Sequence, residues 1–376
     1  MRIGVPKETA EGEHRVALVP EVVGKLTKAG HDVVVEAGAG QGAMLPDSAF
    51  SDAGATIAPD RATIDSADVV VAVAPPSIEQ VGSLKRDSVL IGFLAPLSNG
   101  PGVKALADAG VTSFAMEAVP RISRAQSMDA LSSQSNVAGY RAALIGCQEL
   151  GRFYPMLMTA AGTIRPATVL VLGAGVAGLQ AIATARRLGA VVQAFDVRAA
   201  VKEQVESLGA KFLEFDLGGD LEGEGGYAKE LTVEQRALQQ QLLTEAIGKV
   251  DVVITTALVP GRPAPKLVTA AAVEGMKPGS VVVDLAGEAG GNCELTKPGE
   301  TVVEHGVKIV SPLNLPSTMA EHASQLYAKN IESLLELMTN EEGALTLDFD
   351  DEIIAGACVT KGGEIVHEGA KAAAGA

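Results

Sequence analysis

The pattern of apolar and polar positions predicts strands that alternate with helices. Short runs of Val, Ile and Leu recur along the chain, and longer stretches containing Ala, Lys and Glu separate them. Near-continuous apolar strands separated by helices are typical of parallel sheets that helices cover on both faces. We therefore expect an α/β protein, with strands at 2–5, 32–35, 68–73, 89–94 and 111–116 and, further on, at 168–172, 191–195, 211–215, 251–256, 280–285 and 307–310.

A polar run at 121–140 divides this alternation in two. It holds five serines and two glutamines with few large apolar residues, and it leads into an expected helix that continues to residue 153. A second long helix is expected at 317–338, after the last strand of the middle region. A long helix on each side suggests that the chain leaves the first domain, builds the second, and returns.

We therefore predict two doubly wound, Rossmann-like parallel-sheet domains, of which the first is discontinuous. The first domain consists of residues 1–133 plus 320–376, and the second of residues 134–319. Within the C-terminal segment, 344–347 and 352–367 are expected to form a small strand pair with a turn at 361–363. The Ala- and Gly-rich tail, 370–376, is expected to be disordered.

The segment Gly173–Gly178 has the spacing G-x-G-x-x-G between an expected strand at 168–172 and an expected helix at 179–188. Gly173 permits the tight turn, Gly175 lets a pyrophosphate approach the backbone, and Gly178 lets the helix and strand pack closely. The helix N-terminus then offers N–H groups to the phosphates. The sequence therefore predicts a dinucleotide site here.

Asp196 closes the next expected strand, 18 residues after Gly178. Its carboxylate can accept hydrogen bonds from both ribose hydroxyls and would repel a 2′-phosphate, which favours NAD(H) over NADP(H). Arg198 argues in the other direction, because a basic residue accommodates that phosphate. The glycine-rich acidic stretch 217–231 follows in the same domain and is either a mobile lid or a solvated surface insertion.

Composition then removes several classes of function. The chain has 376 residues, the size of two domains, and 30 basic against 46 acidic side chains give a net charge of −16. That charge, with no Trp and only 4 Tyr and 8 Phe, argues against nucleic-acid binding. Three dispersed cysteines and an early charged residue, Arg2, indicate a soluble intracellular chain without disulfides or a secretory signal.

The motifs of several enzyme classes are missing from the sequence. There is no H-E-x-x-H, G-x-S-x-G or phosphate-binding G-x-x-x-x-G-K-[ST] pattern, and the histidines show no metal spacing. Arg15 is a candidate carboxylate ligand or a surface arginine paired with an acid. The expected strand ends 73–76 and 93–97 hold no Lys or His to carry a proton. Hydride transfer between two nicotinamides moves no proton, so it needs only correct geometry.

Several of these segments together resemble one family, the NAD(H)-binding domain I of proton-translocating nicotinamide nucleotide transhydrogenase. The likeness covers nearly the whole chain and extends more distantly to alanine dehydrogenase, which shares Arg15. In that relative a Lys and a His occupy two strand ends where this chain has Ala74 and Ala95-Pro96. The segments that carry the resemblance are 5–8, 15–17, 121–140, 173–178, 225–230, 255–261 and 290–293.

The resemblance implies which residues meet the nucleotide. The catalytic set is Arg121, Gln126, Asp129 and Ser132, around the nicotinamide and its ribose, with Tyr227 on a loop that closes over NAD(H). We expect Arg121 and Asp129 to hold each other, although composition alone leaves open that this run is a polar linker. The cofactor-binding residues are Arg121, Ile122, Ser123, Gln126, Gly173, Ala174, Gly175, Val176, Gly178, Asp196, Val197, Arg198, Gly226 and Leu258, and no metal ligand is expected.

The resemblance also implies partners. The family's domain III carries NADP(H) on the β subunit, and membrane-spanning subunits couple hydride transfer to proton movement. This chain would then be a homodimeric subunit in the cytoplasm, peripheral on the inner face of the cytoplasmic membrane and active only with its partners. Two alternatives stay open, namely an NAD-dependent alanine or amino-acid dehydrogenase and a non-catalytic NAD(H)-sensing module.

Overall fold

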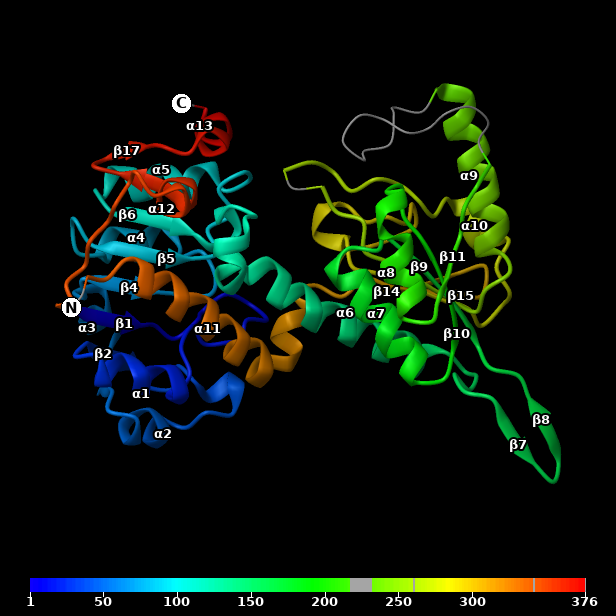
Figure 1. The fold of residues 1–376 in the computed structure, drawn as a ribbon, viewed down its shortest axis with the longest axis horizontal. Helices are drawn as coiled ribbons and strands as arrows, with labels where there is room; N and C mark the ends of the chain where they lie inside the picture. The colour runs from blue at the N-terminus through cyan, green and yellow to red at the C-terminus, as the bar shows by residue number, and fades with distance from the viewer. Residues whose placement is uncertain (217–231, 260, 341, 376) are drawn as a thin grey trace. The chain divides into compact units, whose positions relative to one another are not determined.

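The computed structural model describes residues 1–216, 232–259, 261–340 and 342–375. The chain forms two compact units: unit 1 is Met1–Gln134 with Pro316–Ala376, and unit 2 is Ser135–Leu315. Each unit contains its own sheet and its own hydrophobic clusters (Figure 1). The expected lid at 217–231, with Gly226 and Tyr227, lies outside the described residues.

Unit 1 is built on an eight-stranded sheet in the order β17-β16-β6-β5-β4-β1-β2-β3. The six strands from β6 to β3 are parallel, and β16 and β17 are added antiparallel at one edge. The C-terminal segment therefore completes the first sheet. The strands are β1 (Arg2–Val5), β2 (Asp32–Glu36), β3 (Thr56–Ala58), β4 (Val69–Val71), β5 (Val89–Gly92), β6 (Thr112–Ala115), β16 (Cys358–Lys361) and β17 (Glu364–Ile365).

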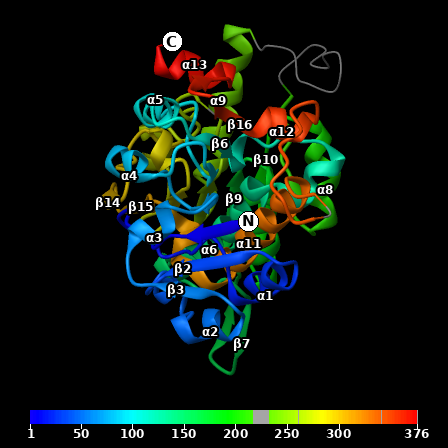
Figure 2. The ribbon, with the colours of Figure 1, turned by 90° about the vertical axis from the view of Figure 1, so that its left-hand side faces the viewer.

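Helices cover both faces of this sheet because successive strand residues point to opposite sides. Val33 and Val35 of β2 pack in one cluster with residues of α1 and α11, whereas Val34 packs in another with residues of α3, α4 and α5. Figure 2 gives a second view, in which α1 can be followed beside its contact partner β2. The helices are α1 (Pro20–Lys28), α2 (Asp47–Asp52), α3 (Arg61–Asp65), α4 (Ile78–Ser83), α5 (Gly100–Asp108), α11 (Ala320–Leu337), α12 (Glu352–Ala357) and α13 (Glu368–Ala374).

Unit 2 has a seven-stranded sheet in the order β11-β10-β9-β12-β13-β15-β14, parallel except for β14. Its strands are β9 (Thr168–Leu172), β10 (Val191–Phe195), β11 (Lys211–Phe212), β12 (Val252–Thr255), β13 (Val281–Asp284), β14 (Thr301–Glu304) and β15 (Val307–Val310). Its helices are α7 (Val176–Arg187), α8 (Lys202–Ser207), α9 (Val233–Ile247) and α10 (Ala270–Glu274), and α6 (Ala130–Glu149) begins in unit 1 and ends in unit 2.

The predicted fold class, two doubly wound α/β domains with the first completed by the C-terminal segment, is confirmed. Several local expectations were wrong. The strand pair at the C-terminus forms between β16 and β17 with its turn at Gly362 and Gly363, but 344–347 is not one of its strands and Glu352–Ala357 is a helix. That helix forms because Asp351 accepts a hydrogen bond from Ile353 N at 2.8 Å and two isoleucines bury their side chains.

The expected disordered tail is also corrected, because Glu368–Ala374 forms helix α13. The side chain of His367 caps this helix at the N–H of Ala370, with a distance of 3.1 Å from Nδ1, and Ala370 is fully buried. The helix packs on α5, where Gly100 lacks a side chain that would collide with the carbonyl of Ala373. Alanine favours helix, and the buried contact with α5 holds it.

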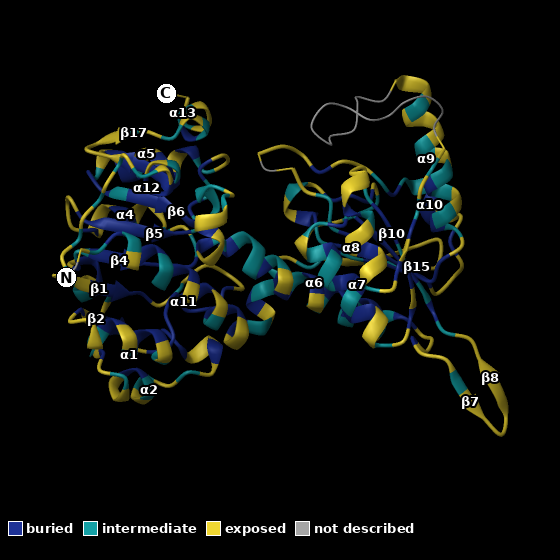
Figure 3. Cartoon of the chain, in the orientation of Figure 1, coloured by how far each residue is buried: buried dark blue, intermediate teal, exposed yellow. Residues whose placement is uncertain are grey.

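One element projects from unit 2. Strands β7 (Leu157–Thr159) and β8 (Gly162–Ile164) form an antiparallel hairpin that joins neither large sheet. Figure 3 shows it almost entirely in the colour of exposed residues, and it extends away from the rest of the unit. Across the residues that the structure describes, every helix is too short or too polar to cross a lipid bilayer.

Candidate functional site

The glycine turn lies in unit 2 between the central strand β9 and helix α7. The N–H of Gly173 donates to the carbonyl of Phe195 at 2.8 Å, which fixes the turn against the end of β10. Among the described residues, no side chain caps the N-terminus of α7, whose N-cap residue is Gly175. The N–H groups of the first turn are therefore available to a ligand, and they favour an anion.

The three glycines of the turn answer different demands. Gly173 has a φ of +99°, and a Cβ there would lie 2.7 Å from Thr256 Oγ1. A Cβ on Gly178 would lie 1.8 Å from the carbonyl oxygen of Gly173, so only glycine lets the helix approach the strand. Gly175 has an ordinary φ of −76°, and a Cβ there would meet no described atom within 4 Å. Packing thus explains two glycines, and the open space at Gly175 fits a phosphate that approaches the backbone.

Asp196 follows β10 and lies against the turn. Its Oδ2 accepts a hydrogen bond from Ala174 N at 2.7 Å, so the carboxylate is tied to the glycine turn. Both of its oxygens also accept from the side chain of Arg198, at 3.0 Å from Nε and 2.9 Å from an Nη atom. Burial raises the pKa of Asp196, but the hydrogen bonds from Arg198 and Ala174 outweigh it and hold that pKa below its ordinary value.

Three of the predicted cofactor-binding residues expose apolar side chains at the carboxyl ends of neighbouring strands. Val176 follows β9, Val197 follows β10 and Leu258 follows β12, and these three strands are adjacent in the sheet. Their exposed fractions are 38%, 59% and 55%. In parallel α/β sheets, ligands bind outside the carboxyl ends of the strands at such a position. The arrangement offers apolar contacts to a nucleotide beside the anion-binding turn.

The role of Asn292 was missed by the sequence analysis. Its side chain is fully buried and holds the segment after β12: Oδ1 accepts from Ala257 N at 3.1 Å, and Nδ2 donates to the carbonyls of Ala257 and Pro265, each at 2.8 Å. Thr256 adds a hydrogen bond from Oγ1 to the carbonyl of Gly173 at 3.0 Å. Asn292 therefore positions the backbone that leads to Leu258. The only sequence signal was an Asn after two glycines beyond a buried strand.

The polar run of unit 1 forms a 3₁₀ helix, Ser123–Met128, followed by the start of α6. The expected pair between Arg121 and Asp129 does not form. Instead Asp129 accepts from Ser132, at 2.9 Å from the backbone N and 2.6 Å from Oγ, which caps the start of α6. The side chains of Arg121 and Gln126 are exposed, so they can contact a ligand.

Arg15 is neither an exposed arginine nor an open carboxylate site. Its side chain is buried, with residue exposure of 7%, and it forms a two-point ion pair with Glu13 at 2.8 and 2.6 Å. A third hydrogen bond runs from Nη1 to Gln134 Oε1 at 2.8 Å. The carboxylate that Arg15 binds in this structure thus belongs to the chain itself.

Two glutamates occupy the strand ends of unit 1 that hold no Lys or His. Glu8 accepts from the N–H of Val73 at 2.6 Å, and Glu117 accepts from the N–H groups of Leu94 and Ala95 at 2.9 and 2.6 Å. Burial raises the pKa of Glu8 to about 7 and also raises that of Glu117. A carboxylate substrate at these strand ends would compete with the chain's own carboxylates for the same donors.

Comparison with known proteins now identifies the family. The model of the alanine dehydrogenase/PNT N-terminal domain matches residues 4–138, and that of the C-terminal domain matches residues 142–368. The chain belongs to the alanine dehydrogenase/PNT family. It is 53% identical over 376 residues to an NAD(P) transhydrogenase alpha subunit of Rhodospirillum rubrum, with 98% of each chain covered.

Two solved structures of this family's fold are similar over the whole chain. The transhydrogenase from Sinorhizobium meliloti has a TM-score of 0.86 and 46% identity, covering 98% of this chain and 99% of that one. An L-alanine dehydrogenase has a TM-score of 0.83 but only 28% identity, with 99% of each chain covered. The fold is thus common to the alanine dehydrogenase/PNT family, whereas the sequence is more similar to the transhydrogenases in these comparisons.

The residues predicted to bind the nucleotide lie in both units of this family member. The glycine turn, Asp196, Arg198 and Leu258 belong to unit 2, whereas Arg121 to Ser132 belong to unit 1. Within the residues that the structure describes, no group of three or more His, Cys, Asp or Glu side chains is placed to hold a metal ion. The residues therefore fit a dinucleotide that binds through backbone N–H groups and a carboxylate.

Proposed function

We propose that this chain is the NAD(H)-binding subunit of a proton-translocating NAD(P) transhydrogenase. The observation that carries the proposal is the 53% identity to a transhydrogenase alpha subunit across 98% of both chains. The open space at Gly175 and the uncapped start of α7 support nucleotide binding at the turn of unit 2. When bound, NAD(H) supplies or accepts the hydride at its nicotinamide ring.

The chain's own residues would bind and orient that nucleotide rather than move a proton. Backbone N–H groups of α7 hold the pyrophosphate, Asp196 accepts from the ribose, and Arg121 and Gln126 orient the nicotinamide. Asp129 and Ser132 fix the start of α6 through the hydrogen bonds between them. Gly226 and Tyr227 belong to the same proposed site, as do Ile122 and Ser123.

We infer that the second nucleotide, NADP(H), is carried by domain III of a β subunit. Hydride then passes directly between the two nicotinamides, and membrane-spanning subunits couple the step to proton translocation. The chain is active only with these partners and is peripheral on the cytoplasmic face of the membrane. The alternative of a self-sufficient alanine dehydrogenase is disfavoured because the strand-end donors at Val73, Leu94 and Ala95 are already bound by Glu8 and Glu117.

We also propose that the subunit is a homodimer, supported by the β7–β8 hairpin. The exposed fractions of Met156, Met158 and Ile164 are 58%, 73% and 48%. A two-stranded hairpin is marginally stable alone, and a second copy offers the same apolar surface for mutual burial. The wild-type chain should elute near the mass of two 38.4 kDa subunits in light-scattering chromatography. Met158→Asp should shift it toward one subunit, and a monomeric wild type would contradict the dimer.

The catalytic proposal is tested with the chain alone and with an NADP(H)-loaded domain III. The chain alone should bind NADH but reduce almost no NADP⁺ analogue, and addition of domain III should raise the rate by orders of magnitude. Alanine with NAD⁺ serves as the matched assay for the alternative function. Robust alanine oxidation by the chain alone would refute the proposal, and tight NADH binding without transfer in either assay would favour a sensing module.

A further inference from the structure

The carboxylate of Asp196 has no acceptor position left for a ligand in this structure. A carboxylate offers about four lone-pair positions, two on each oxygen. Oδ1 accepts from the backbone N and from Nε of Arg198, at 2.9 and 3.0 Å, and Oδ2 accepts from Ala174 N and from an Nη atom of Arg198, at 2.7 and 2.9 Å. A ribose can therefore be held by Asp196 only if one of these donors leaves.

The four donors are not equally free to leave. Ala174 N and Arg198 N belong to the backbone of the glycine turn and of the residue after β10, so they stay in place. The guanidinium of Arg198 is on a side chain that is 47% exposed, whereas the side chain of Asp196 is only 5% exposed. The arginine side chain can swing into water, and the carboxylate cannot follow it.

The guanidinium also has the geometry of the group it would be replaced by. Its two N–H donors form a planar fork that meets one position on each carboxylate oxygen. The two adjacent hydroxyls of a ribose present two O–H donors to a carboxylate in the same manner. Arg198 therefore places in the site two donors of the kind that the ribose brings.

We propose that Arg198 is an internal competitor for the adenosine ribose: it occupies Asp196 when no nucleotide is bound and leaves when the ribose binds. This inference rests on the proposed function, because it requires NAD(H) at the turn of unit 2. The released guanidinium carries its charge beside the ribose 2′ position. It thus offsets the repulsion between Asp196 and a 2′-phosphate, and Arg198 lowers the discrimination between NADH and NADPH.

The size of the competition follows from the ion pair that must break. A partly exposed ion pair contributes up to about 1 kcal/mol, which is about a five-fold change in a dissociation constant. Arg198→Ala should therefore lower the dissociation constant for NADH by about two- to five-fold and raise that for NADPH. Arg198→Lys keeps the charge but loses the fork, so it should tighten NADH binding without weakening NADPH binding.

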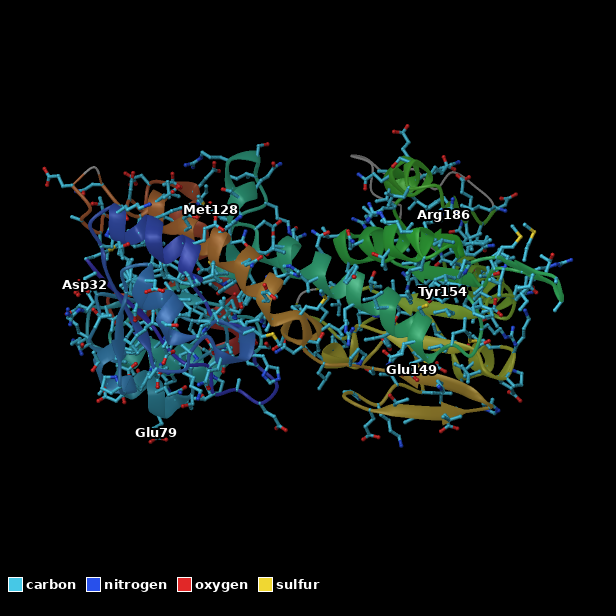
Figure 4. All side chains as sticks on the ribbon, turned by 90° about the horizontal axis from the view of Figure 1, so that it is seen from below. Asp32, Glu79, Met128, Glu149, Tyr154 and Arg186 are labelled. Carbon is cyan, nitrogen blue, oxygen red and sulfur yellow. The ribbon has the colours of Figure 1, made fainter. Side chains whose placement is uncertain are left out.

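The experiment measures NADH and NADPH binding to the full chain by fluorescence titration, for the wild type, Arg198→Ala and Arg198→Lys. Arg187→Ala is the matched control, since it removes one exposed positive charge at the C-terminal end of α7, next to Arg186, which Figure 4 labels. This control should leave both constants unchanged. A weaker affinity for NADH in Arg198→Ala, or two unchanged constants, would overturn the inference while leaving the proposed function intact.

A second measurement reports on the arginine itself. In a chain labelled with ¹⁵N-arginine, the Nε–H resonance of Arg198, assigned by its loss in Arg198→Lys, should shift when NADH is added. A resonance unmoved by saturating NADH would mean that the guanidinium stays on Asp196, which contradicts the inference. If the wild-type chain bound neither nucleotide, both this inference and the proposed function would fall.

Discussion

The glycine turn permits a test that separates packing from ligand binding. Gly175→Ala adds a methyl group where no described protein atom lies within 4 Å, at a residue with an ordinary φ of −76°. Alanine is a poorer N-cap than glycine, which costs a few tenths of a kcal/mol or more. It also reduces the entropy of the unfolded chain, which contributes about 0.4–1 kcal/mol of stability. The free energy of unfolding should therefore stay within about 1 kcal/mol of the wild-type value.

The same substitution three residues later should behave in the opposite way. In Gly178→Ala the new methyl group would lie 1.8 Å from the carbonyl oxygen of Gly173, so α7 must move away from β9. Overpacking of this kind costs about 1–3 kcal/mol or more, and the better helix propensity of alanine returns only about 1 kcal/mol. Gly178→Ala should lose at least about 1 kcal/mol of stability.

Binding of NADH should separate the two variants from a third. The methyl group of Gly175→Ala takes the space that a pyrophosphate needs near the start of α7, so NADH affinity should fall at least about ten-fold, or about 1.4 kcal/mol. Gly82→Ala, a glycine of α4 with no described atom within 4 Å of its added Cβ, is the control and should bind NADH like the wild type. Urea unfolding and NADH fluorescence titration measure the two quantities. If Gly175→Ala bound NADH within about two-fold of the wild type, the turn would not be the pyrophosphate site.

Three further predictions concern other residues of the two units. Gln126→Asn should slow hydride transfer with domain III far more than it weakens NADH binding, because positioning is its role, and equal losses in both would contradict that role. Glu8 has a pKa raised by burial from 4.5 to about 7, so the folded chain binds its proton more tightly and unfolding free energy should fall as pH rises through this window. Glu8→Gln should remove up to about 3 kcal/mol of that fall between about pH 5 and pH 8, in urea unfolding with the exposed Glu21→Gln as control, and an unchanged profile would refute the assignment. Asn292→Ala should cost about 3 kcal/mol of stability by leaving three backbone hydrogen bonds unmade and should weaken NADH binding, whereas unchanged binding would show that the segment near Leu258 does not contact the nucleotide.

The strands of the two sheet centres could be predicted from the sequence because they are continuous apolar runs. Thr168–Leu172 and Val191–Phe195, for example, were expected with the bounds that β9 and β10 have. The edge strands were missed, since β14 (Thr301–Glu304) is largely exposed and its sequence lacks a buried face. Edge strands bury little apolar surface, so their pairing is decided by neighbours rather than by their own pattern.

The site was predictable where the backbone conformation itself demands a residue type. The strand–turn–helix around Gly173 and Gly178 follows from such demands, and the structure contains both the positive φ and the close approach. Contacts between distant residues could not be predicted in this way. Asn292 reaches back to Ala257, and Asp129 takes the donors of Ser132 rather than Arg121, because short polar side chains bond to whichever backbone or hydroxyl group folding brings near them.

The central claim is direct hydride transfer from a nucleotide on this chain to one on a partner. NADH that carries deuterium at the transferred position of C4 is mixed with the chain, domain III and NADP⁺, and the NADPH formed is analysed by mass spectrometry. The account predicts that the deuterium appears in NADPH without loss to water, and only when both proteins are present. Deuterium released to the solvent, or transfer that proceeds without domain III, would contradict it.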